Sequence, residues 1–164
     1  MGANEFDDPR IAGVYDVFDS DRGDLDLYLA IVAELGASSV LDLGCGTGTL
    51  AIMLAGSGCD VAGVDPAGAM LDVARGKPGA DRVRWIHGDA LAVPAELSVD
   101  VVTLTGNAAQ AIVDDADWRR TLEAVHPCTR ATAASFRNGA SSYSQSATIP
   151  AHFLLSSAPR PLGY

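Results

Sequence analysis

Four short runs of apolar residues, each bounded by glycine or polar residues, recur between residues 39 and 104 of this chain. Runs of this length are too short for most helices and are typical of buried strands in a parallel sheet. The last run is almost wholly apolar, which favours a central position in that sheet. The predicted strands are Ser39–Leu43, 60–64, Val83–His87 and 99–104.

The segments around these runs carry apolar residues at helical spacing. Leu25, Leu29 and Val32 recur in this way over residues 23–36, and Gly36 provides a helix stop. Further helices are predicted at 47–56, 65–76 and 114–125.

The predicted helix at 65–76 has its own start signal. Asp65 suits the cap position and Pro66 the first helical position. The apolar face of this helix consists of Met70, Leu71 and Ala74.

Strands that alternate with helices of these lengths predict right-handed crossovers and a parallel sheet. The chain has 164 residues, enough for one domain with a hydrophobic core but short for two. We therefore predict an α/β fold of the Rossmann-like, doubly wound type, with a mostly parallel sheet, helices on both faces and an incomplete set of late strands.

The charge balance narrows the choice of partners. The chain has 21 acidic and 11 basic residues, which give a formal net charge of -10. Such a surface repels nucleic acid and anionic membranes, so neither is an expected partner. Residues 1–10 lack the apolar core of a secretory signal, and no window resembles a membrane span. We expect a cytoplasmic protein.

Neither the cysteines nor the histidines have the spacing of a metal site, and none is expected. Three widely separated cysteines also fit no disulfide framework, so free thiols are predicted. The residues concerned are Cys45, Cys59, Cys128, His87, His126 and His152.

The composition changes after Glu123, the last acidic residue of the chain. Beyond it, residues 131–136 form the one plausible strand, and the remainder is rich in serine and alanine without a clear period. We predict one domain over residues 1–136 and a poorly structured tail over 137–164.

The most informative segment is residues 40–48, VLDLGCGTG, in which a buried strand runs directly into a glycine-rich loop. Glycines at alternate positions let a backbone approach a ligand closely and adopt torsions closed to other residues. Open α/β sheets bind small molecules at the carboxyl ends of their strands. A ligand is therefore expected at Gly44, Gly46 and Gly48.

Two common ligands of such loops fit poorly. A dinucleotide fingerprint requires glycine where Thr49 stands, and a phosphate loop requires a lysine that this segment lacks. Asp42 directly precedes the loop, and a carboxylate there suits a cationic ligand better than a pyrophosphate. A nicotinamide oxidoreductase remains the less favoured alternative.

Acidic residues follow the next two predicted strands as well. Asp65 ends the second strand, where a carboxylate can hold the hydroxyls of a ribose. Asp89, within Gly88-Asp89-Ala90 after the third strand, can accept from the amine of adenine. A nucleoside is implied.

These residues together resemble the class I S-adenosylmethionine-dependent methyltransferases, and the small single-domain bacterial type in particular. The resemblance rests on residues 40–48, on Val64-Asp65-Pro66, on Gly88-Asp89-Ala90 and on residues 100–107. It covers roughly residues 15–125. The helix after the fourth strand normally leads into a Pro-Gly-Gly turn in this family, but here His126-Pro127-Cys128 follows.

The resemblance implies S-adenosyl-L-methionine as cofactor. The three loop glycines would cradle its methionine part, with Asp42 near the amino group, Asp65 on the ribose and Asp89 on the adenine amine. Tyr15 is similar in placement to residues that close over the cofactor. The full set of expected cofactor-binding residues is Tyr15, Asp42, Gly44, Cys45, Gly46, Gly48, Asp65, Pro66, Met70, Gly88, Asp89, Ala90 and Thr105.

Several of these residues also have a structural interpretation. Asp65 can serve as a helix cap, Met70 can belong to the core, and Cys45 is better explained as a small loop residue than as a nucleophile. Asn107, in the loop after the fourth strand, is the candidate catalytic residue, with a turn-stabilising role as its alternative.

The implied reaction is attack by an acceptor on the sulfonium methyl group, for which orientation suffices and a general base is optional. We expect a small-molecule acceptor. The altered sequence after residue 125 suggests truncation or a shifted reading frame, which leaves a second hypothesis, a cofactor-binding remnant without a competent acceptor site.

Overall fold

A six-stranded sheet forms the centre of the protein in the computed structural model, which describes residues 5–18, 24–105, 108, 112, 114–129, 135–138 and 152–156. The strand order is β3-β2-β1-β4-β6-β5, and every strand pair among the described residues is parallel. The strands are β1 (Ser39–Leu43), β2 (Asp60–Asp65), β3 (Val83–His87), β4 (Val101–Leu104), β5 (Ser135–Asn138) and β6 (His152–Ser156).

Helices connect and flank these strands. The α-helices are α1 (Pro9–Phe18), α2 (Asp24–Glu34), α3 (Thr49–Gly56), α4 (Gly68–Arg75) and α6 (Asp115–Val125). Short 3-10 helices are η1 (Glu5–Asp7), η2 (Ala80–Arg82), η3 (Ala90–Ala92) and η4 (His126–Cys128). The predicted Rossmann-like α/β class is confirmed.

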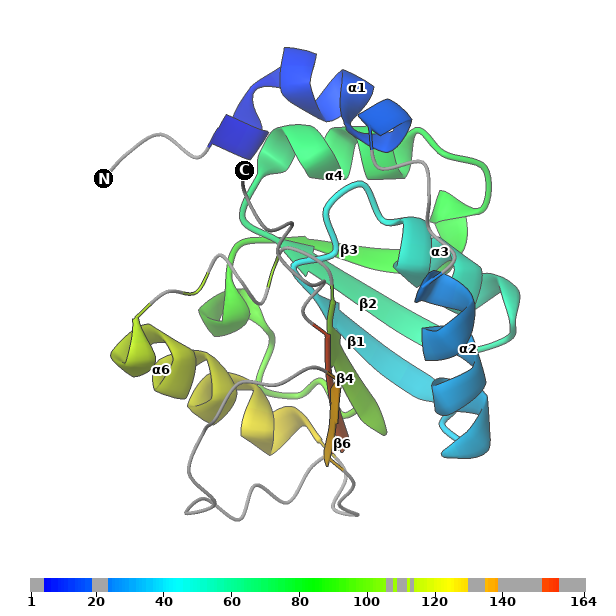
Figure 1. Cartoon of the computed structure of the whole chain (residues 1–164), viewed down its shortest axis with the longest axis vertical. Coiled ribbons are helices and arrows are strands. Elements are labelled where there is room, and N and C mark those ends of the chain that lie inside the picture. Colours follow the sequence, from blue (N-terminus) through cyan, green and yellow to red (C-terminus); the bar gives the residue numbers. More distant parts are fainter. Residues whose placement is uncertain are drawn as a thin grey trace, which may run out of the picture.

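The sheet has a separate hydrophobic core on each face, as its helices lie on both sides (Figure 1). Val40, Val61 and Val101 face α2 and α3, and they join a buried cluster with Leu25 and Leu54. The alternate strand residues face the opposite way and pack against α6 and η3; they are Leu41, Leu43, Ala62, Val64, Val102 and Leu104. This period of two is the physical basis of the apolar runs in the sequence.

A third, smaller cluster lies on the outer side of α4. There α1 lies across α4 (Figure 1), and Ala12 of α1 is buried with Ala67 and Met70. Phe6 and Tyr15 pack against this cluster and contact each other edge to face, with ring centroids 6.0 Å apart. No helix had been predicted over Pro9–Phe18.

Two predicted helix starts are wrong by two or three residues. The helix after β1 begins at Thr49 rather than at residue 47, because Gly48 has a left-handed backbone with φ of 75°. The helix after β2 begins at Gly68, with Ala67 in the cap position. Asp65 and Pro66 therefore lie before α4, so the prediction of Asp65 as its cap is also wrong.

The fourth strand is shorter than the predicted 99–104. Val99 forms only an isolated bridge to Thr129, and β4 begins at Val101. Between them the Asp100 carboxylate accepts hydrogen bonds from the backbone N–H and the hydroxyl of both Ser38 and Ser39, at 2.9 to 3.0 Å. Asp100 thus ties the start of β4 to the start of β1.

The late part of the sheet consists of β5 and β6. The expected strand at 131–136 overlaps β5, although residues 130–134 lie outside the described residues. Most of the predicted tail, 137–164, also lies outside them, apart from the end of β5 and the whole of β6. The proposed boundary at residue 136 therefore stays a prediction.

Within the described ranges, no helix is both long and apolar enough to cross a membrane. The same ranges contain no group of three or more histidine, cysteine or acidic side chains arranged to hold a metal ion. In the structure the three cysteines, all within these ranges, are free thiols.

Candidate functional site

The glycine-rich loop between β1 and α3 is held by the end of β2. The N–H groups of Gly44 and Cys45 both donate to the carbonyl oxygen of Val64, at 2.8 and 3.0 Å. The Gly48 N–H closes the turn by donating to the Cys45 carbonyl at 2.9 Å. The backbone torsion φ is positive at Gly44, Gly46 and Gly48, which strongly favours glycine at these positions.

The three glycines have different surroundings. A side chain at Gly44 would overlap the methyl group of Ala108, and one at Gly48 would overlap the ring of Trp85. At Gly46 no atom of the residues that the structure describes lies within 4 Å of the position that a Cβ would take. Gly44 and Gly48 are therefore required by packing as well as by torsion, whereas Gly46 leaves an open space in front of the loop.

Asp65, at the end of β2, joins this loop to the segment that leads into α4. One carboxylate oxygen accepts from the Gly46 N–H and the other from the Ala67 N–H, both at 2.8 Å. The residue is only 7 % exposed. Burial raises the pKa of its carboxyl group, while the two N–H groups and His87 act in the opposite direction.

A second carboxylate lies beneath the loop on the neighbouring strand. Asp42 is 2 % exposed, and one of its oxygens accepts from the Thr103 hydroxyl of β4 at 2.7 Å. The nearby Cys45 thiol is sensitive to both acids: its pKa is raised first by burial and then by the charges of Asp42 and Asp65. The thiol therefore stays protonated, which favours the structural role of Cys45 over a nucleophilic one.

The charges of Asp42 and Asp65 that raise the pKa of the buried Cys45 thiol also determine the electrostatic potential at the loop. Two largely buried carboxylates produce a negative potential around Cys45, which Arg75 only partly offsets. A low-dielectric region with this potential favours a ligand that carries positive charge. The open space in front of Gly46 adjoins this region, because Gly46 is bonded to Asp65.

The end of β3 joins the same edge of the sheet. The Gly88 N–H donates to the Asp65 carbonyl at 2.9 Å, and Gly88 has a positive φ of 142°. Asp89 follows with an exposed side chain that accepts from the Leu91 N–H at 2.9 Å and caps η3. Ala90 is buried. The structure thus brings together the three strand ends that the sequence had indicated.

The remaining predicted residues divide between core and surface. Met70 is 3 % exposed and lies in the cluster beneath α1, which supports its structural interpretation, while its adenine contact stays a prediction. Tyr15 packs against the same cluster, and Pro66 is exposed with its carbonyl 3.1 Å from Nε2 of His87. Thr105 is half-buried beyond β4, and the candidate Asn107 lies outside the described residues.

Sequence reasoning missed a polar cluster next to the loop. Thr47 and Thr49, which flank Gly48, contact Asp16 of α1 and Lys77, respectively. It also missed Trp85, whose ring fills the space beside Gly48. The alternation of β3 could have placed Trp85 on the face of α3, but no local pattern indicates contacts between residues this distant in the sequence.

This combination of an α/β sheet and a glycine loop flanked by acids defines a Rossmann-like domain. Residues 40–132 match the family described as the methyltransferase domain, and the chain belongs to that family. The match begins at the first residue of the glycine motif and extends past α6, so the resemblance to class I methyltransferases is confirmed.

Individual relatives agree with this assignment. A demethylmenaquinone methyltransferase from Clavibacter sepedonicus is 41% identical over 76 residues, which are 45% of this chain and 31% of the relative. The SAM-bound amino pentose methyltransferase of calicheamicin biosynthesis from Micromonospora echinaspora is 26% identical with a TM-score of 0.61, over 72% of this chain and 52% of that one. The CcbJ methyltransferase from Streptomyces caelestis is 29% identical with a TM-score of 0.64, over 73% and 51%.

The chain therefore spans less than a third of this curated relative and about half of the two solved structures. The matched part contains the glycine loop and both carboxylates beside it.

Proposed function

We propose that this chain binds S-adenosyl-L-methionine at the β1–α3 loop and transfers its methyl group to a small-molecule acceptor. The observation that carries the proposal is the open space before Gly46, adjoining the buried carboxylates of Asp42 and Asp65. Membership of the methyltransferase domain family supports it.

The charge of the site fits this cofactor. S-adenosylmethionine supplies a methyl group on a positively charged sulfur, together with a cationic amino group. The same two acids that raise the pKa of the Cys45 thiol favour positive charge at the loop. A pyrophosphate would be repelled by them, so the geometry argues against a nicotinamide dinucleotide.

The hydrogen-bonding capacity of Asp65 fits a ribose. Each oxygen of an ionised carboxylate can accept two hydrogen bonds, and among the described residues each oxygen of Asp65 accepts one, from a backbone N–H. The remaining capacity can serve ribose hydroxyls. Because Gly46 and Ala67 already orient the carboxylate, its position is set before the ligand arrives, which lowers the entropic cost of binding.

The chain's own residues would act by orientation and by exclusion of water. The glycine loop and Asp65 would hold the cofactor, and α1 would cover it through Tyr15. Asp89 would accept from the adenine amine, and Met70 would lie beneath the base. Asn107 stays the candidate for orienting the acceptor. Proximity alone can lower the activation barrier of methyl transfer by roughly several kcal/mol, so no dedicated nucleophile is required.

A small, uncharged or cationic acceptor fits the strongly acidic chain better than nucleic acid does. The amino pentose methyltransferase and the demethylmenaquinone methyltransferase act, by their names, on small molecules.

We propose that the protein is located in the cytoplasm. We also propose that residues 1–136 form the methyltransferase domain and that 137–164 form a poorly structured tail.

Calorimetric titration tests the cofactor. The wild-type protein should bind S-adenosylhomocysteine, the reaction product, and should not bind a nicotinamide dinucleotide. Asp65→Asn should weaken product binding about tenfold or more, because a neutral amide accepts less strongly from hydroxyls than a carboxylate.

Asp60→Asn is the matched control, since Asp60 lies at the opposite end of the same strand and is exposed. Equal loss in both variants would contradict the assignment of Asp65, and dinucleotide binding would overturn the choice of cofactor. Transfer of labelled methyl groups to a metabolite pool then separates an active enzyme from a remnant that only binds.

A further inference from the structure

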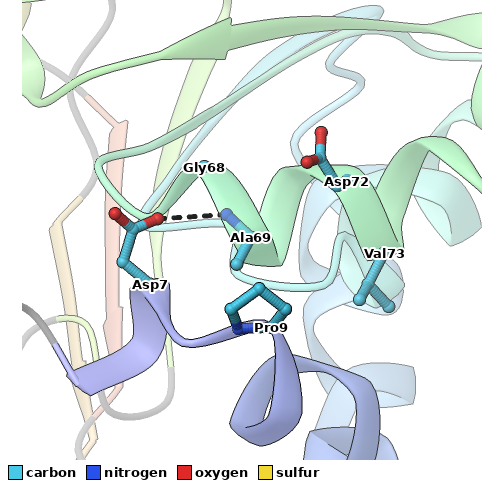
Figure 2. Close-up of a pocket in the computed structure, with 6 residues that line it drawn as sticks. All are labelled: Asp7, Pro9, Gly68, Ala69, Asp72 and Val73. Carbon is cyan, nitrogen blue, oxygen red and sulfur yellow. Dashed lines mark hydrogen bonds between the residues drawn. The ribbon is translucent and has the colours of Figure 1, made fainter.

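The N-terminal segment is attached to the domain at two polar points. At one end, Asp7 of η1 accepts from the Ala69 N–H of α4 at 3.1 Å, on an open groove that Pro9 and Val73 also line (Figure 2). This contact supplies α4 with an acceptor for its N-terminus, since Ala67 in the cap position has no polar side chain.

At the other end, Asp16 of α1 contacts the glycine-rich loop between β1 and α3. One of its carboxylate oxygens accepts from the Thr47 hydroxyl at 2.5 Å, and the other is 2.6 Å from the Lys77 ammonium group. Lys77 also donates to the Thr49 hydroxyl at 3.1 Å. Four side chains from α1, the loop, α3 and the turn after α4 thus form one connected network.

Thr47 and Thr49 lie on either side of Gly48, so this network holds the loop at its exit into α3. Thr49 occupies the place where a dinucleotide fingerprint has glycine, and its hydroxyl serves here to bind Lys77. Side-chain exposure is 23% for Lys77 and 40% for Asp16, so water screens the pair only in part.

Lys77 also has an electrostatic role. Asp16 approaches a loop around which Asp42 and Asp65 already create negative potential. Without a neighbouring cation, its carboxylate would be repelled by these acids. The ammonium group of Lys77 compensates that charge on the side of α1, which leaves the two buried acids to act on the ligand.

We propose that Lys77 is a positioning residue for the cofactor site: it holds Asp16 against Thr47 and thereby keeps α1, with the adjacent Tyr15, closed over the loop. The idea rests on the proposed function for its ligand, but the attachment of α1 can be measured without any ligand. Lys77 itself would touch neither the cofactor nor the acceptor.

Five variants test this proposal: Lys77→Met, Lys77→Arg, Thr47→Val, the double variant of Lys77→Met with Thr47→Val and, as control, Arg120→Met. Arg120 also forms an ion pair, 3.4 Å from Asp117 on the exposed side of α6, so its loss removes the same charge far from the loop. Affinity for S-adenosylhomocysteine is measured by calorimetry, attachment of α1 by amide hydrogen exchange without ligand, and folding by thermal denaturation.

Lys77→Met should weaken binding about five- to tenfold and accelerate exchange in α1, while β1 and β2 stay protected. Lys77→Arg should restore affinity to within about twofold, because it keeps the charge. Thr47→Val should resemble Lys77→Met, and the double variant should lose less than the two single losses combined. Arg120→Met should behave as the wild type.

Unchanged exchange in α1 of Lys77→Met would overturn the proposal, and so would unchanged affinity when the wild type binds. A loss of affinity that Lys77→Arg does not restore, and that follows a general fall in thermal stability, would reduce Lys77 to a structural residue. Failure of the wild type to bind S-adenosylhomocysteine would refute the proposed function instead, and the exchange data would still decide whether Lys77 attaches α1.

Discussion

The carboxylate of Asp65 holds two backbone segments in register and, in the proposed function, a ribose as well. Its bonds to Gly46 and Ala67 explain why α4 starts later than the sequence indicates. A sequence pattern identifies Asp-Pro as a helix start because it registers only local contacts. Gly46, which also donates to the Asp65 carboxylate, belongs to the loop after the preceding strand, so the residues around Asp65 do not reveal this contact.

Burial raises the pKa of Asp65, so its titration should appear in ligand binding. The ionised form accepts hydrogen bonds from hydroxyls more strongly, so affinity for S-adenosylhomocysteine should fall as the pH drops from neutral toward this raised pKa. Asp65→Asn should bind weakly and without that dependence. Calorimetry at several pH values checks this, and a wild-type profile as flat as that of the variant would contradict it.

In the ligand-free protein, the contribution of Asp65 to the free energy of unfolding should change with pH in the opposite direction to its contribution to ligand affinity. Because the folded-state pKa is raised, the contribution of Asp65 to stability is complete below its unfolded pKa of about 3.9 and is lost as the pH rises through the folded pKa. The ligand and the fold therefore favour different protonation states of Asp65.

Gly46 and Gly48 should respond differently to the same substitution. Gly48→Ala places a methyl group against Trp85 on a left-handed backbone, and we expect a loss of about 2–4 kcal/mol in the free energy of unfolding. Gly46→Ala adds only the torsional cost, about 1–2 kcal/mol. Its methyl group enters the open space, so it should weaken S-adenosylhomocysteine binding more than tenfold.

Chemical denaturation and calorimetry on both variants separate the two effects. Gly58→Ala is a control for torsion alone, since Gly58 has φ of 103° and no described residue has an atom within 4 Å of its Cβ position. Comparable affinities of Gly46→Ala and the wild type would place the ligand elsewhere.

At the scale of elements, strands were predicted better than helices. The bounds of β1 and β3 agree with the sequence prediction, and β2 differs by one residue, because burial on both faces leaves a direct record in apolar runs. The predicted start of β4 was wrong because Asp100 binds Ser38 and Ser39 through its side chain, and Val99 forms only an isolated bridge to Thr129. Helix α1 escaped prediction because its buried side rests mainly on Ala12, a small residue.

Asp100 should make the pairing of β1 with β4 sensitive to acid. The Ser38 N–H is the first of several donors that hold the pKa of the Asp100 carboxyl well below its usual range. A lowered folded-state pKa contributes stability that is complete above the unfolded pKa, about 3.9, and is lost as the pH falls through the folded pKa.

Asp100→Asn should therefore lower the free energy of unfolding by about 1–2 kcal/mol at pH 7, with a smaller difference in strong acid. Urea denaturation at several pH values measures this. Asp60→Asn, an exposed acid at the start of β2, should change little at any of them. A pH-independent loss in Asp100→Asn would assign the effect to packing instead.

At the scale of the whole molecule, the composition changes after Glu123, and the domain boundary at residue 136 is the part of the prediction that awaits measurement. The structure pairs β6 with β4 and β5, and those contacts are the means by which the tail would be ordered. If the tail is poorly structured, amides of residues 137–164 should exchange rapidly, while those of β1 and β2 exchange slowly. Strong protection of His152–Ser156 would contradict the boundary.

The ring of Trp85 restricts which residues can stand at two positions that are distant from it in the sequence, 48 and 63. It occupies the space where side chains at Gly48 and Gly63 would lie, with Gly63 in an ordinary extended strand rather than at positive φ. Among homologues, alanine at residue 63 should therefore be more frequent where residue 85 is smaller than tryptophan, although the Cys45 sulfur, 3.1 Å from the same Cβ position, must also shift. Residue 48 stays glycine in either case, because its torsion requires it.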